Sequence, residues 1–243
     1  MSEHTDITRA GTMVAIGIVS ASLIFSIFFY AARVVNPGEL SVTGSARIRV
    51  TSDTVKWTMQ LSRFSDSTGL ESVYRELEAD RVTVLSVLAD QGILSENVVA
   101  TPVFTEQDYS YTYDLSAPRK YTIRQTLTVE SNDIDQITRV AKNIQNLVSV
   151  GSVISTYSLE YLYSKLPELR VELLSDAVID AKARAEKIAE SSGSRVGSLR
   201  AASQGVVQVL APNSVEVSDY GAYDTSSIEK EVMATVRASF GVK

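Results

Sequence analysis

Residues 177–199 read AVIDAKARAEKIAESSGSRVGSL, and this stretch combines a helix, a helix stop and the first residues of a strand. Small or apolar residues recur in it at steps of three and four, which predicts that they share one helix face: Ala177, Ala181, Ala185 and Ile188. Gly193 follows the last of these, where a helix end favours a left-handed residue. Because methyl-sized side chains allow close approach, we expect this helix to lie directly against a β-sheet.

A second strong feature is the uncharged run at residues 11–32, which Arg9 and Arg33 bound. As a helix it is long enough to cross the hydrocarbon core of a bilayer, about 30 Å. Aromatic residues gather at its C-terminal end, as in an interfacial belt: Phe25, Phe28, Phe29 and Tyr30. We therefore assign residues 10–33 to a transmembrane anchor, residues 1–9 to a cytoplasmic tail and residues 34–243 to an ectodomain.

A cleaved signal peptide is the competing interpretation of this run. The length of the run, the lack of a basic excess before it and the lack of an A-x-A site after it all favour an uncleaved anchor. The flanking charges are too few to decide the orientation. Inside the anchor, small residues recur with a spacing that allows helices to associate: Gly11 with Ala15, and Gly17 with Ala21.

Composition excludes several classes of chemistry. The chain has no cysteine and a single histidine, His4, so the ectodomain has no imidazole and no thiol. Ser-His-Asp and Cys-His catalysis, disulfides and His- or Cys-ligated zinc are therefore excluded. The net charge is −6 and there is no run of basic residues, so we expect no nucleic-acid partner. We also expect no catalytic residues, no cofactor and no metal site.

The hydrophobic pattern of the ectodomain predicts an α+β fold. Alternating residues at 40–50 and 55–61 predict a hairpin. Helical periodicity follows at 70–91, 133–147 and 167–192, and further strands are expected at 97–113, 120–130, 152–163, 196–210 and 232–242. The order is ββαββαβαββ: antiparallel sheets with three helices, preceded by one transmembrane helix. Residues 211–227 are polar and are expected to form a long loop.

The order of these patterns resembles the SIMPL-domain family, formerly a domain of unknown function. The resemblance covers about residues 40–242. It rests on Leu40-Ser41-Val42-Thr43-Gly44 followed by Asp53-Thr54-Val55, on Gly92-Ile93 with Val98 and Thr101, on Tyr121, and on Asp180-Ala181-Lys182-Ala183 through Ala189, Gly193, Val196 and Gly197. The family commonly has proline before the aspartate where this chain has Ser52. No single motif is specific; their order and spacing together carry the resemblance.

The resemblance implies an exported bacterial protein, which here would be a single-pass protein of the inner membrane with its ectodomain in the periplasm. It also implies homo-oligomeric rings or cages in some members, and links to stress tolerance and host immunogenicity. The family has no defined catalytic residues, so none is carried over. Unlike secreted members, this chain keeps what looks like a membrane anchor.

Three motifs with chemical potential have simpler structural explanations. Ser227-Ile228-Glu229-Lys230 fits S-x-x-K, but it lacks the companion motifs and the helical context. Asp176 and Asp180 share a helix face, and Arg184 at i,i+4 from Asp180 makes a solvated charged face the expected explanation. Asp133 and Asp135 stand where negative charge suits a helix N-terminus.

Two sets of residues are candidates for an oligomer interface. Tyr109, Tyr111 and Tyr113 leave one face of their predicted strand, and tyrosine is enriched at interfaces, although sheet packing explains them as well. The long loop carries more apolar side chains than a solvated linker needs: Val215, Val217, Tyr220 and Tyr223.

The sequence therefore favours a membrane-anchored, homo-oligomeric scaffold of the cell envelope that is not an enzyme. Its expected partners are other copies of itself and the lipid bilayer. The alternative is a binding module that captures a peptide, a lipid or a protein by a sheet edge or a tyrosine-rich face. A hydrolase that uses carboxylates alone is the least favoured possibility.

Overall fold

A computed structural model describes residues 3–35, 38–108, 118–143, 153–214, 218 and 220–243. The apolar N-terminal helix α1 spans Glu3–Val35. The other helices are α2 (Leu70–Asp90), η1 (Ser95–Asn97), α3 (Ile134–Lys142) and α4 (Leu166–Ser191). The strands are β1 (Glu39–Thr51), β2 (Thr54–Asp66), β3 (Val98–Ala100), β4 (Phe104–Gln107), β5 (Lys120–Ser131), β6 (Val153–Leu162), β7 (Val196–Gln204), β8 (Gln208–Leu210) and β9 (Glu229–Val242).

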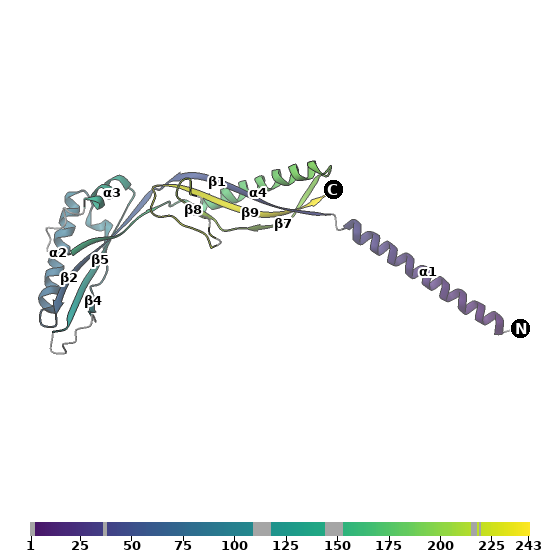
Figure 1. The fold of residues 1–243 in the computed structure, drawn as a ribbon, viewed down its shortest axis with the longest axis horizontal. Helices are drawn as coiled ribbons and strands as arrows, with labels where there is room; N and C mark the ends of the chain where they lie inside the picture. Colours follow the sequence, from purple (N-terminus) through teal and green to yellow (C-terminus); the bar gives the residue numbers. More distant parts are fainter. Residues whose placement is uncertain (1–2, 36–37, 109–117, 144–152, 215–217, 219) are drawn as a thin grey trace. The chain divides into compact units, whose positions relative to one another are not determined.

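The strands form two antiparallel sheets (Figure 1). One sheet has the order β1-β9-β7, with β8 also paired to β9, and the other has the order β3-β5-β2-β6, with β4 also paired to β5. The chain divides into two compact units: the first holds residues 1–46, 174–205 and 235–243, and the second holds residues 47–173 and 206–234. The predicted α+β class is confirmed.

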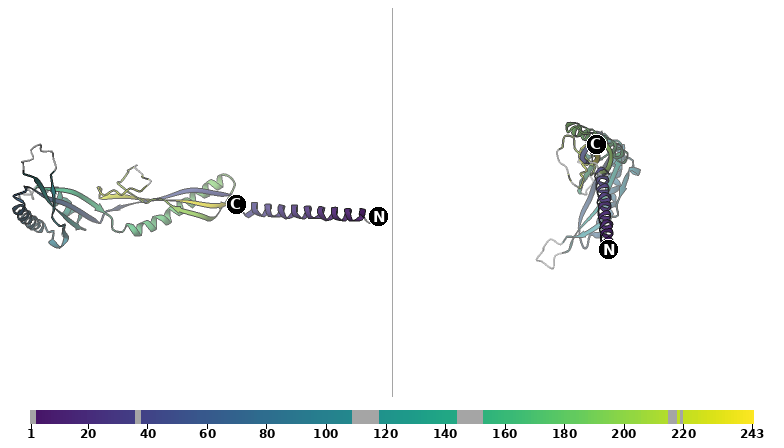
Figure 2. Two further views of the ribbon diagram at one scale, coloured as in Figure 1. Left: turned by 90° about the horizontal axis from the view of Figure 1, so that it is seen from below. Right: turned by 90° about the vertical axis from the view of Figure 1, so that its right-hand side faces the viewer.

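The core of the first unit is built from small side chains, where α4 runs along the sheet (Figure 2). On α4 the fully buried residues are alanines at steps of four, and they pack on β9: Ala177, Ala181 and Ala185 against Val236, Ala238 and Phe240. Gly44 of β1 brings the strand backbone against the helix, because a Cβ there would lie 2.2 Å from the Ala177 carbonyl oxygen and 2.7 Å from Ala181 Cβ. The predicted packing of an alanine face on a sheet is therefore confirmed.

A carboxylate on α4 accepts a hydrogen bond from a backbone N–H group of β1 beside this contact. Asp180 Oδ2 accepts hydrogen bonds at 2.8 Å from the backbone N–H of Ser45 and at 2.8 Å from Arg184 Nε. The Ser45 hydrogen bond is the main cause that lowers the pKa of Asp180. The i,i+4 pair is thus confirmed, and Asp180 also joins the helix to β1.

The core of the second unit uses large side chains. Alternate residues of β2 and β5 point toward α2 and α3 and are fully buried, among them Val55, Trp57, Met59, Leu61, Ile123, Leu127 and Val129. The helices contribute Leu77, Val84, Leu88 and Ile137 to the same core. The opposite face of this sheet is not covered by these helices. It carries the intervening residues of β2 and β5.

Several sequence predictions were wrong in detail. Residues 40–50 and 55–61 do not form a hairpin, because β1 pairs with β9 while β2 pairs with β5 and β6. Instead, the backbone N–H of Ser52 donates to Ile228 O, and that of Asp53 donates to Leu162 O. These long-range bonds replace the local ones of a hairpin, so the two strands enter different sheets.

Two predicted strands are interrupted, and the short helix η1 precedes one of them, so the element order differs from ββαββαβαββ. The segment 97–113 contains β3 and β4 with Pro102 between them, where no backbone N–H is available. The segment 196–210 splits into β7 and β8 around Gly205, where a Cβ would meet Thr235 Oγ1. On α4, Ile188 is half exposed, and Ala189 takes the buried position that completes the alanine series.

Candidate functional surfaces

The helix α1 exposes an apolar surface between Gly11 and Tyr30. Every side chain in this range is exposed, and the segment is apolar and long enough to cross a membrane. Among the described residues it is the one helix with that length and composition. Phe25 and Phe29 stack, with ring centroids 6.4 Å apart. Such a surface needs an apolar environment, because burial of these side chains is favourable and the described part of the chain does not supply it.

The small residues of α1 keep open space around them. Apart from the neighbouring residues and the backbone of α1 itself, no described heavy atom lies within 4 Å of where a Cβ would stand at Gly11 or Gly17, and Ala15 and Ala21 are exposed. The expectation that these four residues mediate helix association stays a prediction.

The segment 211–228 is held by its own unit at several points. The β8 residue Val209 donates its backbone N–H to Ala222 O and accepts from the N–H of Asp224, both at 2.8 Å. Gln208 exchanges hydrogen bonds with the backbone of Ser218, and Thr225 O accepts from the Tyr161 N–H. The described residues of this segment form a loop, as predicted, and several of them are hydrogen-bonded to their own unit.

The S-x-x-K motif begins at the end of this segment, continues into β9 and forms a structural clasp. Lys230 is fully buried, and its Nζ donates to the carbonyl oxygens of Asp224 at 2.6 Å and Ser227 at 2.8 Å. Nζ also lies 3.7 Å from Asp224 Oδ2, while the Ser227 hydroxyl donates to the same carboxylate. The ammonium therefore holds two main-chain oxygens, and the serine is turned toward a carboxylate. The Lys230 amine contacts the main-chain oxygen of Ser227, so it is not placed as a base on the Ser227 hydroxyl.

The charges of the clasp explain its shifted pKa values. Burial raises the pKa of Asp224, but hydrogen bonds from Ser226 and Ser227 outweigh it and lower the value to about 2. Burial lowers the pKa of Lys230, and the charge of Asp224 partly offsets this effect. Asp224 is therefore ionised at neutral pH, and its carboxylate faces the amine of Lys230, which suits a clasp rather than a proton-transfer site.

The predicted interface residues have divided outcomes. Tyr220 is 97% exposed and Tyr223 is 43% exposed, so both have surface available for a partner. Tyr109, Tyr111, Tyr113, Val215 and Val217 lie outside the described residues. The Asp133 prediction is confirmed as a helix cap, because its Oδ1 accepts from the Gln136 N–H at 2.9 Å.

The uncovered face of the second sheet carries aromatic residues that sequence analysis missed. Phe64 is 70% exposed and Phe104 is 59% exposed, and the guanidinium of Arg124 lies over the Phe104 ring at 5.4 Å. Arg124 also pairs with Glu106. The strand phase could have revealed Phe64, because Val55, Trp57, Met59 and Leu61 occupy the inward positions and Phe64 falls on the other face.

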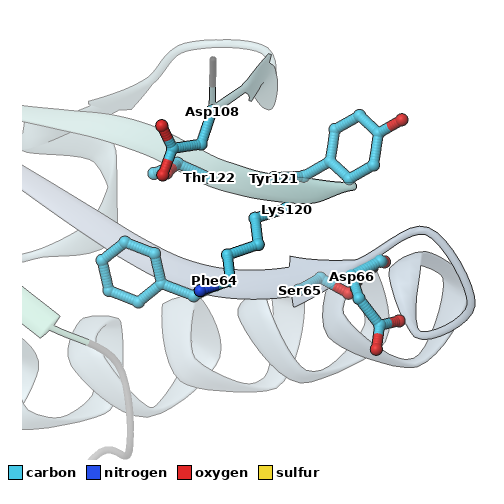
Figure 3. A pocket seen from close by; sticks show the side chains of 7 residues that line it. All are labelled: Phe64, Ser65, Asp66, Asp108, Lys120, Tyr121 and Thr122. Carbon is cyan, nitrogen blue, oxygen red and sulfur yellow. Dashed lines mark hydrogen bonds between the residues drawn. The ribbon is translucent and has the colours of Figure 1, made fainter. Parts of the chain in front are cut away.

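A shallow cavity of about 500 Å³ lies at the end of this sheet (Figure 3). Its lining residues come from β2, β5 and the end of β4: Phe64, Ser65, Asp66, Asp108, Lys120, Tyr121 and Thr122. Lys120 extends from β5 toward Phe64 of β2 (Figure 3). Asp66 is engaged elsewhere, because its Oδ1 accepts from the backbone N–H groups of Thr68 and Gly69.

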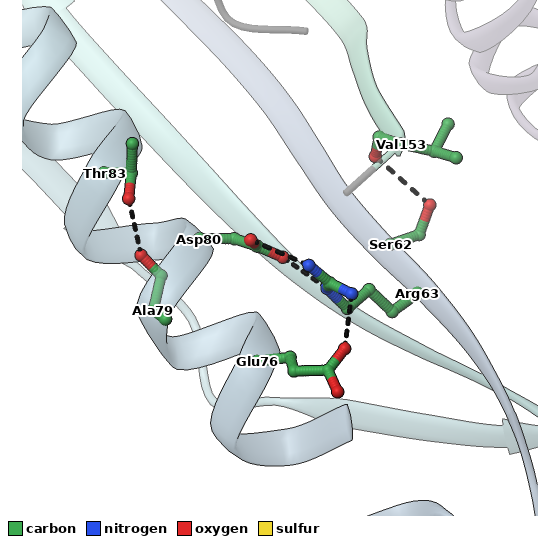
Figure 4. A network of polar contacts seen from close by, with 7 residues as sticks. All are labelled: Ser62, Arg63, Glu76, Ala79, Asp80, Thr83 and Val153. Atoms are coloured by element: carbon green, nitrogen blue, oxygen red, sulfur yellow. Dashed lines mark hydrogen bonds and ion pairs between the residues drawn. The ribbon is translucent and has the colours of Figure 1, made fainter. Parts of the chain in front are cut away.

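On the covered face, a charge network joins β2 to α2 (Figure 4). Arg63 binds the nearly buried carboxylate of Asp80 through two nitrogens and reaches Glu76 with its third, at 2.5 Å. The hydrogen bond to Asp80 is the main cause that raises the pKa of Arg63. Removing one partner of such a pair leaves a buried charge, so the network orients α2 on the sheet.

The fold and these surfaces define a class of protein: an antiparallel α+β domain that follows an apolar helix of membrane-spanning length. A family model matches residues 40–240, which is most of the chain. The chain therefore belongs to the SIMPL family, described as a protein of unknown function (DUF541). No curated protein matches the chain.

Proposed function

We propose that this SIMPL-family protein is a membrane-anchored, extracytoplasmic scaffold of the cell envelope, built from several copies of the same chain. The observation that carries the anchoring is the fully exposed apolar segment Gly11–Tyr30. A cleaved signal sequence has a similar length and composition, so the anchoring is decided by whether this segment is retained in the mature protein.

Anchoring and orientation are tested together. We expect the full chain to resist alkaline carbonate extraction, and protease added to intact spheroplasts to digest the ectodomain. Mass spectrometry of the membrane fraction should detect peptides from residues 3–35. Release by carbonate, loss of these peptides, or full protection of the ectodomain would each contradict the proposal.

Two features support the homo-oligomeric part of the proposal. Within the described residues, the edge strand β7 pairs with β9 alone and is exposed along most of its length, so its outer edge can pair with another strand. Tyr220 adds an almost fully exposed aromatic ring on the loop. A transmembrane helix by itself gains no hydrophobic energy from association, so we expect the ectodomain to supply most of the contacts.

Light scattering of the detergent-extracted chain tests this assembly. We expect a mass of several chains, and Tyr220→Ser should lower the order of assembly without changing the circular dichroism. Tyr157→Ser is a matched control, since Tyr157 is an exposed tyrosine on β6. A monomer at micromolar concentration would overturn the scaffold and favour the binding module.

The second candidate function is the binding module, and the cavity beside Phe64 and Lys120 favours it. An exposed aromatic ring next to a cation suits a partner that has both apolar and anionic groups. A non-enzymatic role agrees with the Ser227–Lys230 clasp and with an ectodomain that has no histidine or cysteine.

A further inference from the structure

The sheet of the first unit has two chemically different faces. Helix α4 packs on one face through the alanine core (Figure 2). In the part of the chain that the structure describes, no other helix of this unit takes part in that core, and the opposite face of β1, β9 and β7 carries polar side chains. We call this second surface the open face. It includes Ser41, Thr43, Ser45, Ser203, Thr235 and Ser239.

Strand pairing places two cations at one end of the open face. The Arg195 N–H donates to Lys243 O at 2.8 Å, and the Lys243 N–H donates to Arg195 O at 2.9 Å. Residues that exchange both bonds in this way have their side chains on the same face. The next pair, Val196 with Val242, belongs to the α4 side, because Val196 packs on the alanine core. Alternation therefore puts Arg195 and Lys243 on the open face.

Two further arginines lie on this face. The guanidinium of Arg200 lies over Gly241, where a Cβ would meet its Nε at 3.3 Å and its Nη2 at 3.5 Å. Arg237 pairs with Ser203 and stands farther along β9. At the usual rise per strand residue, Arg237 is about 20 Å from Lys243. All four cations are exposed, and within the described ranges none of them forms an ion pair.

The charge of the open face is unusual for this chain. The whole chain has a net charge of −6. Among the described residues of the first unit, however, strand alternation places only one acidic side chain, Glu39, on the open face. On α4, three acids form ion pairs with bases: Asp180 with Arg184, Glu186 with Lys182, and Glu190 with Lys187. Glu186 and Glu190 also line one cavity with Arg195, so their charges lie near that cation. With four cations against Glu39, the open face of the first unit carries an excess of positive charge.

The short connection between α1 and β1 keeps this patch close to the apolar helix. Helix α1 ends at Val35, and Gly38 O accepts a hydrogen bond from the Val242 N–H at 2.8 Å. Three residues reach at most about 11 Å, and the helix continues about 5 Å beyond Ala32, so Gly38 lies within about 15 Å of the apolar span. Lys243 is one strand away from Gly38 and Arg195 is two strands away, which adds about 5 Å and about 10 Å. The headgroup layer is itself about 5–8 Å deep on each side of a bilayer. Arg195, Arg200 and Lys243 can therefore reach it.

We propose that Arg195, Arg200 and Lys243 bind the phosphate groups of anionic lipids in the bilayer that holds α1. The proposal rests on the proposed anchoring. Each cation near an anionic surface contributes about fivefold to the binding equilibrium, and the attraction fades within a Debye length of about 8–10 Å. This interaction holds the first unit at the membrane surface. Arg237 is on the same face but farther from the anchor and contributes less.

The natural lack of cysteine permits a direct test on the full chain. A donor dye on Ser239→Cys reports the open face, and one on Ala183→Cys reports the exposed side of α4 as the matched control position. The labelled chains are inserted into vesicles of phosphatidylcholine with or without phosphatidylglycerol, and energy transfer to a headgroup-labelled lipid is measured. We expect transfer from position 239 to rise with phosphatidylglycerol and to fall at high salt, while transfer from position 183 does not rise.

The charge variants decide which residues act. The triple variant Arg195→Ser, Arg200→Ser, Lys243→Ser should weaken the surface-bound state about a hundredfold and abolish the response to phosphatidylglycerol. Arg237→Ser, the matched control, should retain most of it. Equal transfer with and without phosphatidylglycerol overturns the proposal. Transfer that follows the protein-to-lipid ratio instead of lipid charge also overturns it, because the patch then meets a second copy.

Failure of the anchoring gives a different result. In that case carbonate releases the chain from the vesicles. Sedimentation of the released chain with the same two kinds of vesicle then decides the lipid proposal by itself. Binding that needs phosphatidylglycerol and is lost in the triple variant supports it, and equal sedimentation with both lipids overturns it.

Discussion

The two units solve the packing of helices on a sheet in opposite ways. In the first unit, α4 presents alanines and β1 presents Gly44, so that backbone approaches backbone. In the second, α2 and α3 cover the sheet through Trp57, Met59, Leu77 and other large side chains. A core of large side chains is stabilised mainly by buried apolar area. A core of methyl groups buries less area and depends on close fit, so the two units should respond to opposite kinds of mutation.

The largest effect is expected from creating a cavity in the second unit. Leu127 is fully buried on β5 opposite Met59, so Leu127→Ala should destabilise this unit by about 3–4 kcal/mol. Guanidinium unfolding followed by the fluorescence of Trp57, the single tryptophan, measures it. Thr128→Ala, on the opposite face of the same strand, is the control and should change the midpoint little. Equal midpoints for the two variants would show that the core does not depend on Leu127.

The first unit should instead be destabilised by a larger side chain in its core. Ala181→Leu adds three heavy atoms where Gly44 and the helix are already in contact, and overpacking should cost about 2–3 kcal/mol. Ala183→Leu, on the exposed side of α4, is the control. Circular dichroism reports the loss, while Trp57 fluorescence shows whether the second unit unfolds with the first. An unchanged dichroism midpoint would mean that Ala181 does not face the core.

The clasp at Asp224 makes part of the stability of the second unit dependent on pH. The pKa of Asp224 is about 2 in the folded chain, against an ordinary value of 3.8, so the contribution is complete above 3.8 and is lost as the pH falls toward 2. The shift corresponds to about 2 kcal/mol. Asp224→Asn should lower the unfolding midpoint at neutral pH and remove this part of the acid dependence. Parallel pH profiles for variant and parent would contradict the assignment.

Local patterns predicted much of the fold. The helical period located α2 and α4 to within a residue or two, and the alternation at 40–46 correctly placed Gly44 with the inward residues. The pairing of β1 could not be predicted in this way, because its hydrogen-bonded partner β9 is far away in the sequence. Such long-range bonds leave no local periodicity in the sequence.

The functional surfaces were less accessible to sequence analysis than the fold. The S-x-x-K spacing was visible, but the burial of Lys230 and its two carbonyl partners follow from how residues 224–230 fold back. The open face was missed for a related reason. Arg195 and Lys243 become neighbours only through the register of β7 on β9. Composition showed a net negative chain and gave no sign of a segregated positive face.

The smallest expected change in stability distinguishes Asp180 from Asp176, which the sequence analysis placed together on one helix face. Asp180→Ala removes the acceptor of the Ser45 N–H and should cost about 1 kcal/mol, whereas Asp176→Ala, on the exposed side of the same helix, should cost almost nothing. Because Ser45 is only half buried, water can replace part of the lost bond. Urea midpoints by circular dichroism should therefore fall for the first variant only. If both variants fell equally, helix charge rather than the bond to β1 would account for Asp180, and the close fit of the first unit would depend on its alanines and Gly44 alone.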